Sequence, residues 1–349
     1  MPASSRASVT AKPRSPASPL ALTLGDPAGI GPDITMAAWL QRAKRGLTPF
    51  VVFGDPETLA ARARALRVDV PLAVVGSPGE AAAAFADALP VLASDARKGD
   101  TAVLDTIVAA TAAVAAGECL ALVTNPIAKK ALQSADLQQP GHTELLAVLA
   151  ARHNPGRTYK PVMMLASSQL KVVPATVHIP LAAVPKALTR SLLTETIRIT
   201  TAALRDDFAI AHPRLAVTGL NPHCGEGGML GREEIDIIAP VIAELAAGGL
   251  AVTGPHSADA MFHGEARRSY DAAIAMYHDQ ALIPLKTLAF DSGVNVTLGL
   301  PFVRTSPDHG TAFDIAGTGK ASPDSLLAAL QLAAEIGRRR TGAQHPPRP

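Results

Sequence analysis

The sequence predicts an α/β protein whose mostly parallel sheet is covered by helices on both faces. Three observations lead to that class. Strand-like and helix-like segments alternate along most of the 349 residues, and no segment repeats at a fixed period. A hydrophobic share of 48% with 18% charged residues is enough for a large buried core. We therefore expect two α/β/α domains, one formed by 20–129 plus 290–340 and one inserted at 130–289.

The elements expected in the first domain begin with a short apolar strand at 20–24 and a glycine-rich turn. Pro32 suits the first turn of a helix, where its missing N–H is not needed, so a helix is expected from Asp33. Gly117 is expected to end a long alanine-rich helix. The other elements expected there are strands at 50–53 and 119–123 and helices at 56–66 and 101–116.

The same alternation continues to the end of the chain. Helices are expected at 143–152, 192–207, 233–247 and 324–338, and strands at 161–166, 170–177, 215–219 and 294–300. The apolar run 273–277 has the character of a buried strand, and the chain is expected to turn at Pro284. The arginines at 338–340 are expected to form a solvated helix end. Residues 1–19, which hold no acidic residue, and 341–349 are predicted to be disordered tails.

The composition excludes several classes of protein. A net charge of +2 and 3% aromatic residues argue against an extended nucleic-acid surface. No apolar stretch is long enough to cross a bilayer. Cys119 and Cys224 cannot form a disulfide framework or a CxxC metal site. We expect a soluble cytoplasmic protein that binds neither nucleic acid nor membrane.

Polar side chains interrupt the apolar segments between 273 and 304. His278 and Asp279 follow an apolar run, and Lys286, Asn295 and Arg304 come soon after. The ends of apolar segments are where α/β proteins place their sites. Arg304 is a candidate for bidentate binding of a carboxylate or phosphate, with Lys286 as a point charge beside it. His278 alone could well be structural. Arg304 and Lys286 lie in a mostly apolar region, where an unpaired charge is costly, and this favours a functional role for them.

Three histidines share one setting, because His178, His223 and His278 each follow a strand-like segment. Their wide separation gives no local motif, but strand ends in one sheet lie side by side and can converge on one divalent metal. Three neutral imidazoles with an open position would polarise a substrate oxygen. Scattered core and surface histidines remain the alternative.

Two loops are candidates for anion binding. The glycine-rich loop 25–31 does not match G-x-G-x-x-G, and no Walker loop is present, so a tight structural turn explains it at least as well. Residues 141–144 open a helix whose free N–H groups favour an anion such as phosphate. A plain helix cap made by Thr143 or a neighbour is the simpler alternative.

Several motifs together resemble the 4-hydroxythreonine-4-phosphate dehydrogenase family, which acts in pyridoxal 5′-phosphate synthesis. They lie, in the expected order, at 24–33, 124–129, 140–144, 220–228, 270–280 and 293–306. The resemblance implies two α/β domains of the isocitrate/isopropylmalate dehydrogenase type. It also implies a homodimer with a divalent metal (zinc, magnesium or cobalt) at an active site shared between subunits.

The resemblance also implies roles for individual residues. The metal ligands would be His178, His223 and His278, with His278 supplied by the partner subunit. Substrate contacts would be His142, Thr143, Lys286, Asn295 and Arg304. Asp259 matches an acidic position near the substrate, although the usual Thr after it is Ala260 here, and Cys224 replaces a small residue. The segment 308–319 resembles an adenosine-binding loop, so His309, Gly310, Thr311 and Asp314 would bind NAD or NADP.

The implied reaction is the oxidation of 4-phosphooxy-L-threonine to 2-amino-3-oxo-4-phosphooxybutanoate, which decarboxylates to 3-amino-2-oxopropyl phosphate. Lys286 and Asp259 are both candidates for taking the hydroxyl proton. Relatives that oxidise threonate or erythronate 4-phosphate, or a cis-dihydrodiol dicarboxylate, are the nearest alternatives. A metallohydrolase in which three histidines activate water is a more distant one.

Overall fold

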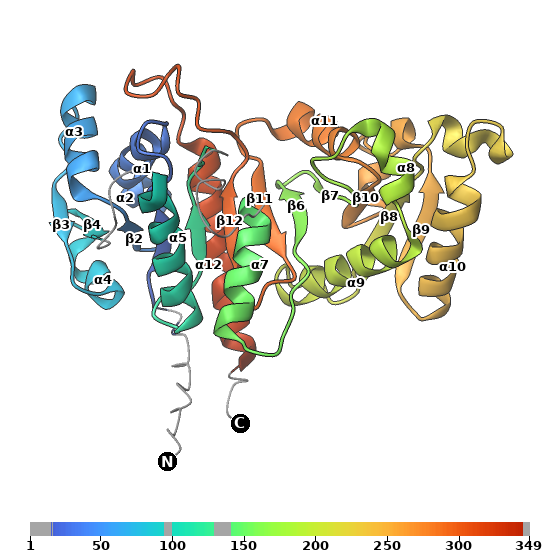
Figure 1. The fold of residues 1–349 in the computed structure, drawn as a ribbon, viewed down its shortest axis with the longest axis horizontal. Helices are drawn as coiled ribbons and strands as arrows, with labels where there is room; N and C mark the ends of the chain where they lie inside the picture. The colour runs from blue at the N-terminus through green and yellow to red at the C-terminus, as the bar shows by residue number, and fades with distance from the viewer. Residues whose placement is uncertain (1–14, 16, 94–99, 129–140, 345–349) are drawn as a thin grey trace, which may run out of the picture.

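A computed structural model describes residues 15, 17–93, 100–128 and 141–344, and it confirms the α/β class. A 12-stranded sheet runs through the molecule, with helices packed on both faces (Figure 1). The described ranges leave out most of the predicted N-terminal tail (1–14 and 16), the last five residues of the predicted C-terminal tail, and residues 129–140. Among the residues that the structure describes, no helix is long and apolar enough to span a membrane.

The strands all belong to that one sheet. They are β1 (Leu20–Thr23), β2 (Phe50–Phe53), β3 (Leu72–Val74), β4 (Leu89–Leu92), β5 (Leu122–Thr124), β6 (Val162–Ala166), β7 (Lys171–Pro174), β8 (Arg214–Thr218), β9 (Ala251–His256), β10 (Ala272–Ala275), β11 (Val294–Leu298) and β12 (Arg304–Pro307).

The helices fall into long covering helices and short connecting turns. The α-helices are α1 (Gly31–Leu40), α2 (Arg42–Arg45), α3 (Pro56–Leu66), α4 (Ala81–Ala84), α5 (Asp100–Ala115), α7 (His142–His153), α8 (Val184–Ala187), α9 (Arg190–Asp206), α10 (Ala239–Ala247), α11 (His278–Ala289) and α12 (Asp324–Gln344). The short turns are η1 (Pro78–Glu80), η2 (Leu181–Ala183), η3 (Pro222–Gly228), η5 (Ala258–Ala260), η6 (Ala266–Arg268) and the π-helical η4 (Glu234–Ile238).

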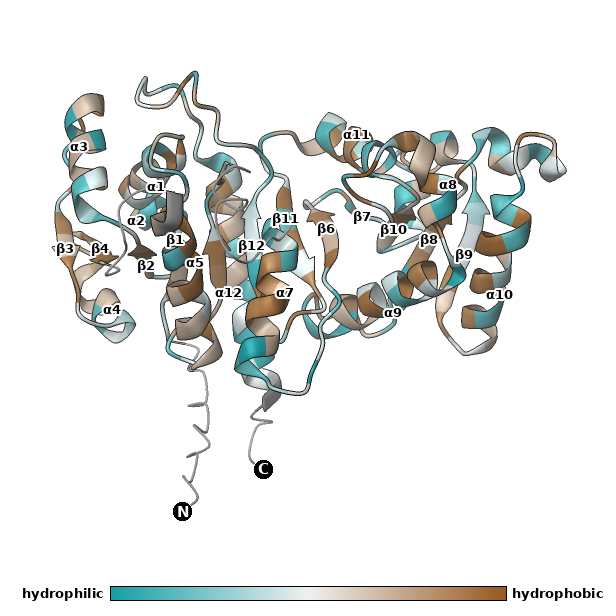
Figure 2. Cartoon of the chain, viewed as in Figure 1, coloured by the Kyte–Doolittle hydropathy of each residue, from teal (hydrophilic) through white to brown (hydrophobic). Residues whose placement is uncertain are grey.

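The strand order across the sheet is β3-β4-β2-β1-β5-β12-β11-β6-β7-β10-β8-β9. The predicted parallel character holds except around β6 and β11, where β11 pairs antiparallel with β12 and β6, and β6 with β7. One apolar cluster continues along the sheet from Leu22 in β1 to Ile274 in β10. In Figure 2 the strands β2, β4 and β10 are brown, which marks their apolar character. The division into two domains remains a prediction, because the sheet is continuous.

Local chemistry explains where helix α3 begins. Asp55 at its N-cap accepts hydrogen bonds from the backbone N–H of Glu57 and Thr58, and Pro56 occupies the first helical position. These features satisfy N–H groups that a helix start leaves free, and the helix has the predicted bounds 56–66.

Two expectations near the C-terminal part are wrong. Pro284 lies inside α11 rather than at a turn. A proline removes one intrahelical hydrogen bond, and buried Leu282 and Leu285 on the same helix provide compensating packing. The helix α12 continues to Gln344, so the first residues of the tail predicted at 341–349 are helical.

Arg338 is exposed as expected, but Arg339 and Arg340 near the end of α12 are held by the protein rather than solvated. Arg340 makes a bidentate ion pair with buried Asp207 at 2.6 and 2.7 Å, and Arg339 donates to the carbonyl of the same residue at 2.8 Å. A carboxylate far away in the sequence therefore fixes the end of the helix.

Candidate functional site

The carboxyl ends of four neighbouring parallel strands carry four of the predicted site residues. Across the sheet the order is β7, β10, β8 and β9, and these strands lead to His178, His278, His223 and Asp259 respectively. We call these four residues the histidine edge. The prediction that the histidine-bearing segments lie side by side is correct for the strands that precede them.

Within the histidine edge, His178 and His278 form a pair. Their ring centroids are 5.3 Å apart, with the rings inclined by 43°. His178 adopts a left-handed backbone conformation (φ 46°) in the loop after β7, and His278 is the first residue of α11. The Nδ1 atom of His278 lies 2.7 Å from Oδ1 of Asp279. A carboxylate accepts hydrogen bonds, so Nδ1 is the donor in this contact and Nε2 is the ring atom that could bind a metal.

His223 stands apart from that pair and is 71% exposed. It lies in η3, where residues 223–227 all have positive φ, an uncommon conformation for non-glycine residues. In the described part of the chain, no group of three His, Cys, Asp or Glu side chains is close enough to hold a metal ion. The three histidines therefore do not form a complete metal site within one chain.

Asp259, in η5, is the exposed outer member of the histidine edge. The hydroxyl of Ser257 donates to its Oδ1 at 2.5 Å, and this hydrogen bond lowers the pKa of the carboxyl. A carboxylate with a lowered pKa is a weaker base than an ordinary aspartate.

A second cluster lies where β5, β12 and β11 run side by side. Arg304, in β12, is 4% exposed and contacts no carboxylate in the described residues. Its guanidinium donates to the hydroxyl of Thr124 at 2.7 and 3.2 Å and to that of Thr297 at 3.0 Å. Burial lowers the pKa of Arg304 to about 10, which still leaves the group charged near neutral pH. A buried cation without an anion is costly, so the site favours an anionic ligand.

His142 adds an unsatisfied polar atom beside Arg304. It is the first residue of α7, a helix that Gly141 begins without a side-chain cap. Its Nε2 is buried and finds no hydrogen-bond partner in the described residues. Burial, and then the charge of Arg304, hold the pKa of His142 well below its usual range, so the imidazole is neutral. Thr143 follows it in the first turn and is half-buried.

Asn295 completes this cluster from β11. The register pairs Asn295 with Ser306, and the neighbouring pairs follow in antiparallel order. Asn295, Thr297 and Arg304 therefore lie on the same face of the sheet. The Oδ1 of Asn295 is also buried without a described partner. We call Arg304, His142, Asn295, Thr124 and Thr297 the anion pocket. A ligand with several acceptor and donor atoms would satisfy these groups.

Lys286 lies between the two clusters on α11. Its Nζ is 3.4 Å from Oδ2 of Asp308 and 3.3 Å from the carbonyl of the same residue. Burial raises the pKa of Asp308, although the lysine opposes that effect. A cavity of about 510 Å³ is lined by Lys286 together with Asp279, Ile283 and neighbours. A smaller one of about 250 Å³ contains His178 and His278. Residues of α11 line both cavities.

The predicted cofactor residues occupy the loop from β12 to α12. His309 contacts the carbonyl of Gly310 through Nδ1 at 3.1 Å, and burial lowers its pKa. Its Nε2 is buried without a described partner, which fits a polar ligand group. Thr311 is half-buried, whereas Gly310 and Asp314 are exposed. The donor chemistry thus fits a polar cofactor in this loop and a divalent metal at the histidine pair.

Two positioning residues were missed by the sequence analysis. Glu234 is 3% exposed and accepts from the backbone N–H of Leu220 and Asn221 at 2.7 and 2.8 Å, which anchors the start of the His223 loop. Gln280 accepts from Thr218 and from the N–H of Met276, which joins the ends of β8 and β10. A signal for Glu234 was present, since an acidic residue closely follows a glycine-rich loop.

Residues 46–333 match the family model described as pyridoxal phosphate biosynthetic protein PdxA. A 4-hydroxythreonine-4-phosphate dehydrogenase of Xanthobacter autotrophicus is 55% identical over 329 residues, which are 91% of this chain and 93% of that protein. The crystal structure of the Klebsiella pneumoniae 4-hydroxythreonine-4-phosphate dehydrogenase superposes with a TM-score of 0.79 at 37% identity, and it covers 92% of this chain and 98% of that chain.

A relative with a different named substrate is also similar. The terephthalate 1,2-cis-dihydrodiol dehydrogenase of Burkholderia xenovorans superposes with a TM-score of 0.60 at 30% identity. That match covers 91% of this chain and 98% of that chain.

Proposed function

The chain belongs to the family of the pyridoxal phosphate biosynthetic protein PdxA, and from that membership we propose that it oxidises 4-phosphooxy-L-threonine. The product would be 2-amino-3-oxo-4-phosphooxybutanoate, a 3-oxo acid that loses CO₂ to give 3-amino-2-oxopropyl phosphate. The protein is a dehydrogenase, as its relatives are. The use of NAD or NADP, of a divalent metal and of a homodimer are parts of the proposal.

The anion pocket carries this proposal. Arg304 is a buried cation with no carboxylate partner in the described residues, and the buried Nε2 of His142 lies beside it without a partner. A phosphate group would neutralise the guanidinium and accept from the uncapped start of α7. Asn295 would orient the substrate on the same sheet face.

The remaining residues would hold the reacting end of the substrate. A bound divalent cation would polarise the substrate hydroxyl, and a nicotinamide would take the hydride from the same carbon. His178, His223 and His278 would hold the cation, and residues 309–314 would hold the cofactor. Lys286 and Asp259 are the two candidates to receive the hydroxyl proton, and the lysine could accept it only in its neutral form.

A dicarboxylate substrate is the second candidate, favoured by the similarity to the cis-dihydrodiol dehydrogenase. Arg304 could bind a carboxylate as well as a phosphate. NADH formation should be measured with 4-phosphooxy-L-threonine, 4-hydroxythreonine, the 4-phosphates of threonate and erythronate, and a cis-dihydrodiol dicarboxylate. The proposal expects the first to be used best, and a clear preference for the dicarboxylate would contradict it.

The substitution Arg304→Lys tests the role of the anion pocket directly. Lysine keeps the charge but loses the planar fork, so kcat/KM for the phosphorylated substrate should fall about tenfold or more. Arg152→Lys, at the exposed far end of α7, is the matched control and should leave kcat/KM unchanged. An unchanged kcat/KM in Arg304→Lys would remove this residue from the site.

A further inference from the structure

The glycine-rich loop 25–31 and the predicted cofactor loop 308–319 are joined into one unit. The N–H of Ile30 donates to the carbonyl of Thr311 at 2.9 Å. Asp33, at the start of α1, accepts from the N–H of Gly317 through Oδ1 at 2.7 Å. Gly29 allows this close approach, because a Cβ there would lie 2.9 Å from the Thr311 carbonyl oxygen. The two loops are far apart in the sequence, so these contacts are tertiary.

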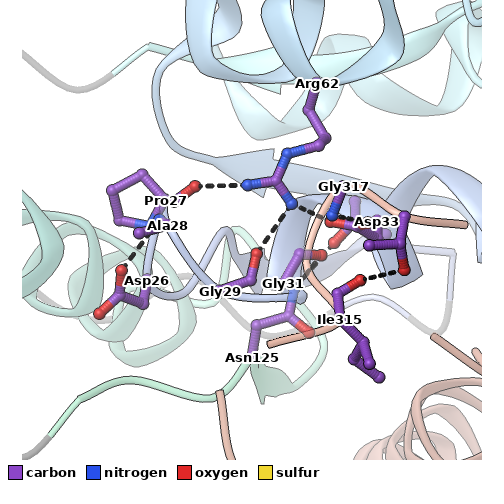
Figure 3. A network of polar contacts seen from close by, with 12 residues as sticks. Asp26, Pro27, Ala28, Gly29, Gly31, Asp33, Arg62, Asn125, Ile315 and Gly317 are labelled. Carbon is purple, nitrogen blue, oxygen red and sulfur yellow. Dashed lines mark hydrogen bonds and ion pairs between the residues drawn. The ribbon is translucent and has the colours of Figure 1, made fainter. Parts of the chain in front are cut away.

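Arg62 of α3 contacts the glycine-rich loop and Asp33 (Figure 3). Its guanidinium forms an ion pair with Oδ2 of Asp33 and donates to the carbonyls of Gly29 and Pro27 at 2.9 and 3.0 Å. The Asp33 side chain is 4% exposed, and both of its oxygens are used. These partners hold the buried carboxylate in one position, and the carboxylate in turn holds the backbone N–H of Gly317.

The loop 25–31 itself has the features of a structural turn. Gly25 has φ 81°, and a Cβ there would lie 2.7 Å from the carbonyl oxygen of Pro126. A Cβ at Gly31 would lie 2.3 Å from the carbonyl oxygen of Leu24. The glycines therefore permit close packing of the backbone, which agrees with the tight-turn alternative.

We propose that Asp33 and Arg62 are positioning residues for the nicotinamide cofactor, an inference that rests on the proposed dehydrogenase function. They touch the loop and not the reacting atoms. By holding the loop 308–319 in one conformation before the cofactor arrives, they remove part of the ordering cost of binding. Loss of either residue should therefore weaken binding of the cofactor more than binding of the phosphorylated substrate, because the hydrogen bonds of Arg304 in the described residues do not involve this pair.

Graded variants separate the contacts. Asp33→Ala removes both the ion pair and the acceptor for Gly317, whereas Asp33→Asn keeps an acceptor oxygen and loses the charge. Arg62→Lys keeps the charge and loses the planar guanidinium with its several N–H donors. NADH should bind about tenfold or more weakly to Asp33→Ala by fluorescence titration, and the other two variants should fall between it and wild type. Arg64→Ala, an exposed position on the same helix, is the matched control and should bind NADH as wild type does.

Kinetics and hydrogen exchange provide the second readout. The KM for NAD should rise in the Asp33 and Arg62 variants, while the KM for the phosphorylated substrate stays within about twofold, a split that a general loss of structure would not produce. Amide exchange in 308–319 should become faster. The positioning role is wrong if Asp33→Ala and Arg62→Lys bind NADH as tightly as wild type does. It is also wrong if the KM for NAD and the KM for the phosphorylated substrate rise together. In either case the proposed function stands. If wild type binds neither NADH nor NADPH, both fail.

Discussion

The anion pocket and the histidine edge differ in how much of a site one chain supplies. Arg304 is buried, and hydroxyl groups on two neighbouring strands hold its guanidinium in place. His223, by contrast, is largely exposed and lies in a loop that does not reach the pair His178 and His278. The pocket is therefore preformed within one chain, whereas the histidine edge is incomplete.

The difference teaches where the missing component must come from. In the anion pocket, Thr124 and Thr297 already orient the guanidinium of Arg304. The histidine edge brings two of its histidines together and leaves the third apart. Exposed apolar side chains surround it, among them Leu181, Met229 and Ile283, which are 65%, 78% and 65% exposed. A second copy of the chain could bury these side chains, and their exposure is consistent with the proposed homodimer.

Removing one histidine should have the largest effect. Each of His178→Ala, His223→Ala and His278→Ala should lower kcat/KM by more than about a hundredfold, because a metal contributes several kcal/mol of transition-state stabilisation. Metal content by atomic emission should fall in parallel, and thermal unfolding should show that the variants are folded. His212→Ala, at a histidine outside the histidine edge, is the control. Full activity in metal-depleted wild type would contradict the metal site.

The anion pocket should instead respond to pH through stability. The pKa of His142 is lowered in the folded state, whereas in the unfolded chain it is near 6.5. The free energy of unfolding should therefore decrease as the pH falls below about 6.5, because the unfolded chain then binds a proton that the folded protein does not. Between about pH 7.5 and about pH 5.5, His142 should lower the free energy of unfolding by at most about 1.4 kcal/mol.

Urea unfolding at both pH values checks this prediction. His142→Gln cannot titrate, so its stability should fall less than that of wild type between the two conditions. His153→Gln, at the exposed end of the same helix, should behave as wild type does. An identical pH dependence in wild type and His142→Gln would mean that His142 is not held neutral.

Local signals in the sequence predicted much of the fold. The strand 50–53 and the helix 56–66 have the predicted bounds, because apolar runs and helix caps act over a few residues. The strand order could not be read in the same way. The antiparallel insertion of β11 between β12 and β6 depends on pairing between segments far apart in the chain, and Pro284 lies in a helix that tertiary packing stabilises.

The candidate site shows the same limit. The sequence singled out Arg304 because a charge in an apolar segment is costly, but it could not show that Thr124 and Thr297 hold it. Glu234 and Asp33 accept hydrogen bonds from backbone N–H groups of loops, and the sequence could not show these contacts because they depend on the tertiary fold. The resemblance supplied residue roles that spacing alone left open, and the roles themselves remain predictions.

The smallest expected effect concerns which chain supplies each histidine. In the proposed arrangement His178 and His223 come from one chain and His278 from the partner. A mixture of His223→Ala and His278→Ala chains would then form heterodimers with one intact site. Random assortment places about half of the chains in heterodimers, and one of their two sites is complete, so about a quarter of wild-type activity should return. Sites built within single chains would give no recovery.

Two further mixtures sharpen the test, because His178 and His278 already lie together in one chain. Mixing His178→Ala with His278→Ala should also restore about a quarter of the activity if His278 crosses the interface. Mixing His178→Ala with His223→Ala should restore none, since both ligands would be needed from the same chain. The reverse result would mean that His178 and His278 act as a pair within one chain and that His223 crosses instead. Exchange of subunits must be verified in each mixture by mass spectrometry of differently tagged chains, so that absent recovery reports the geometry of the site.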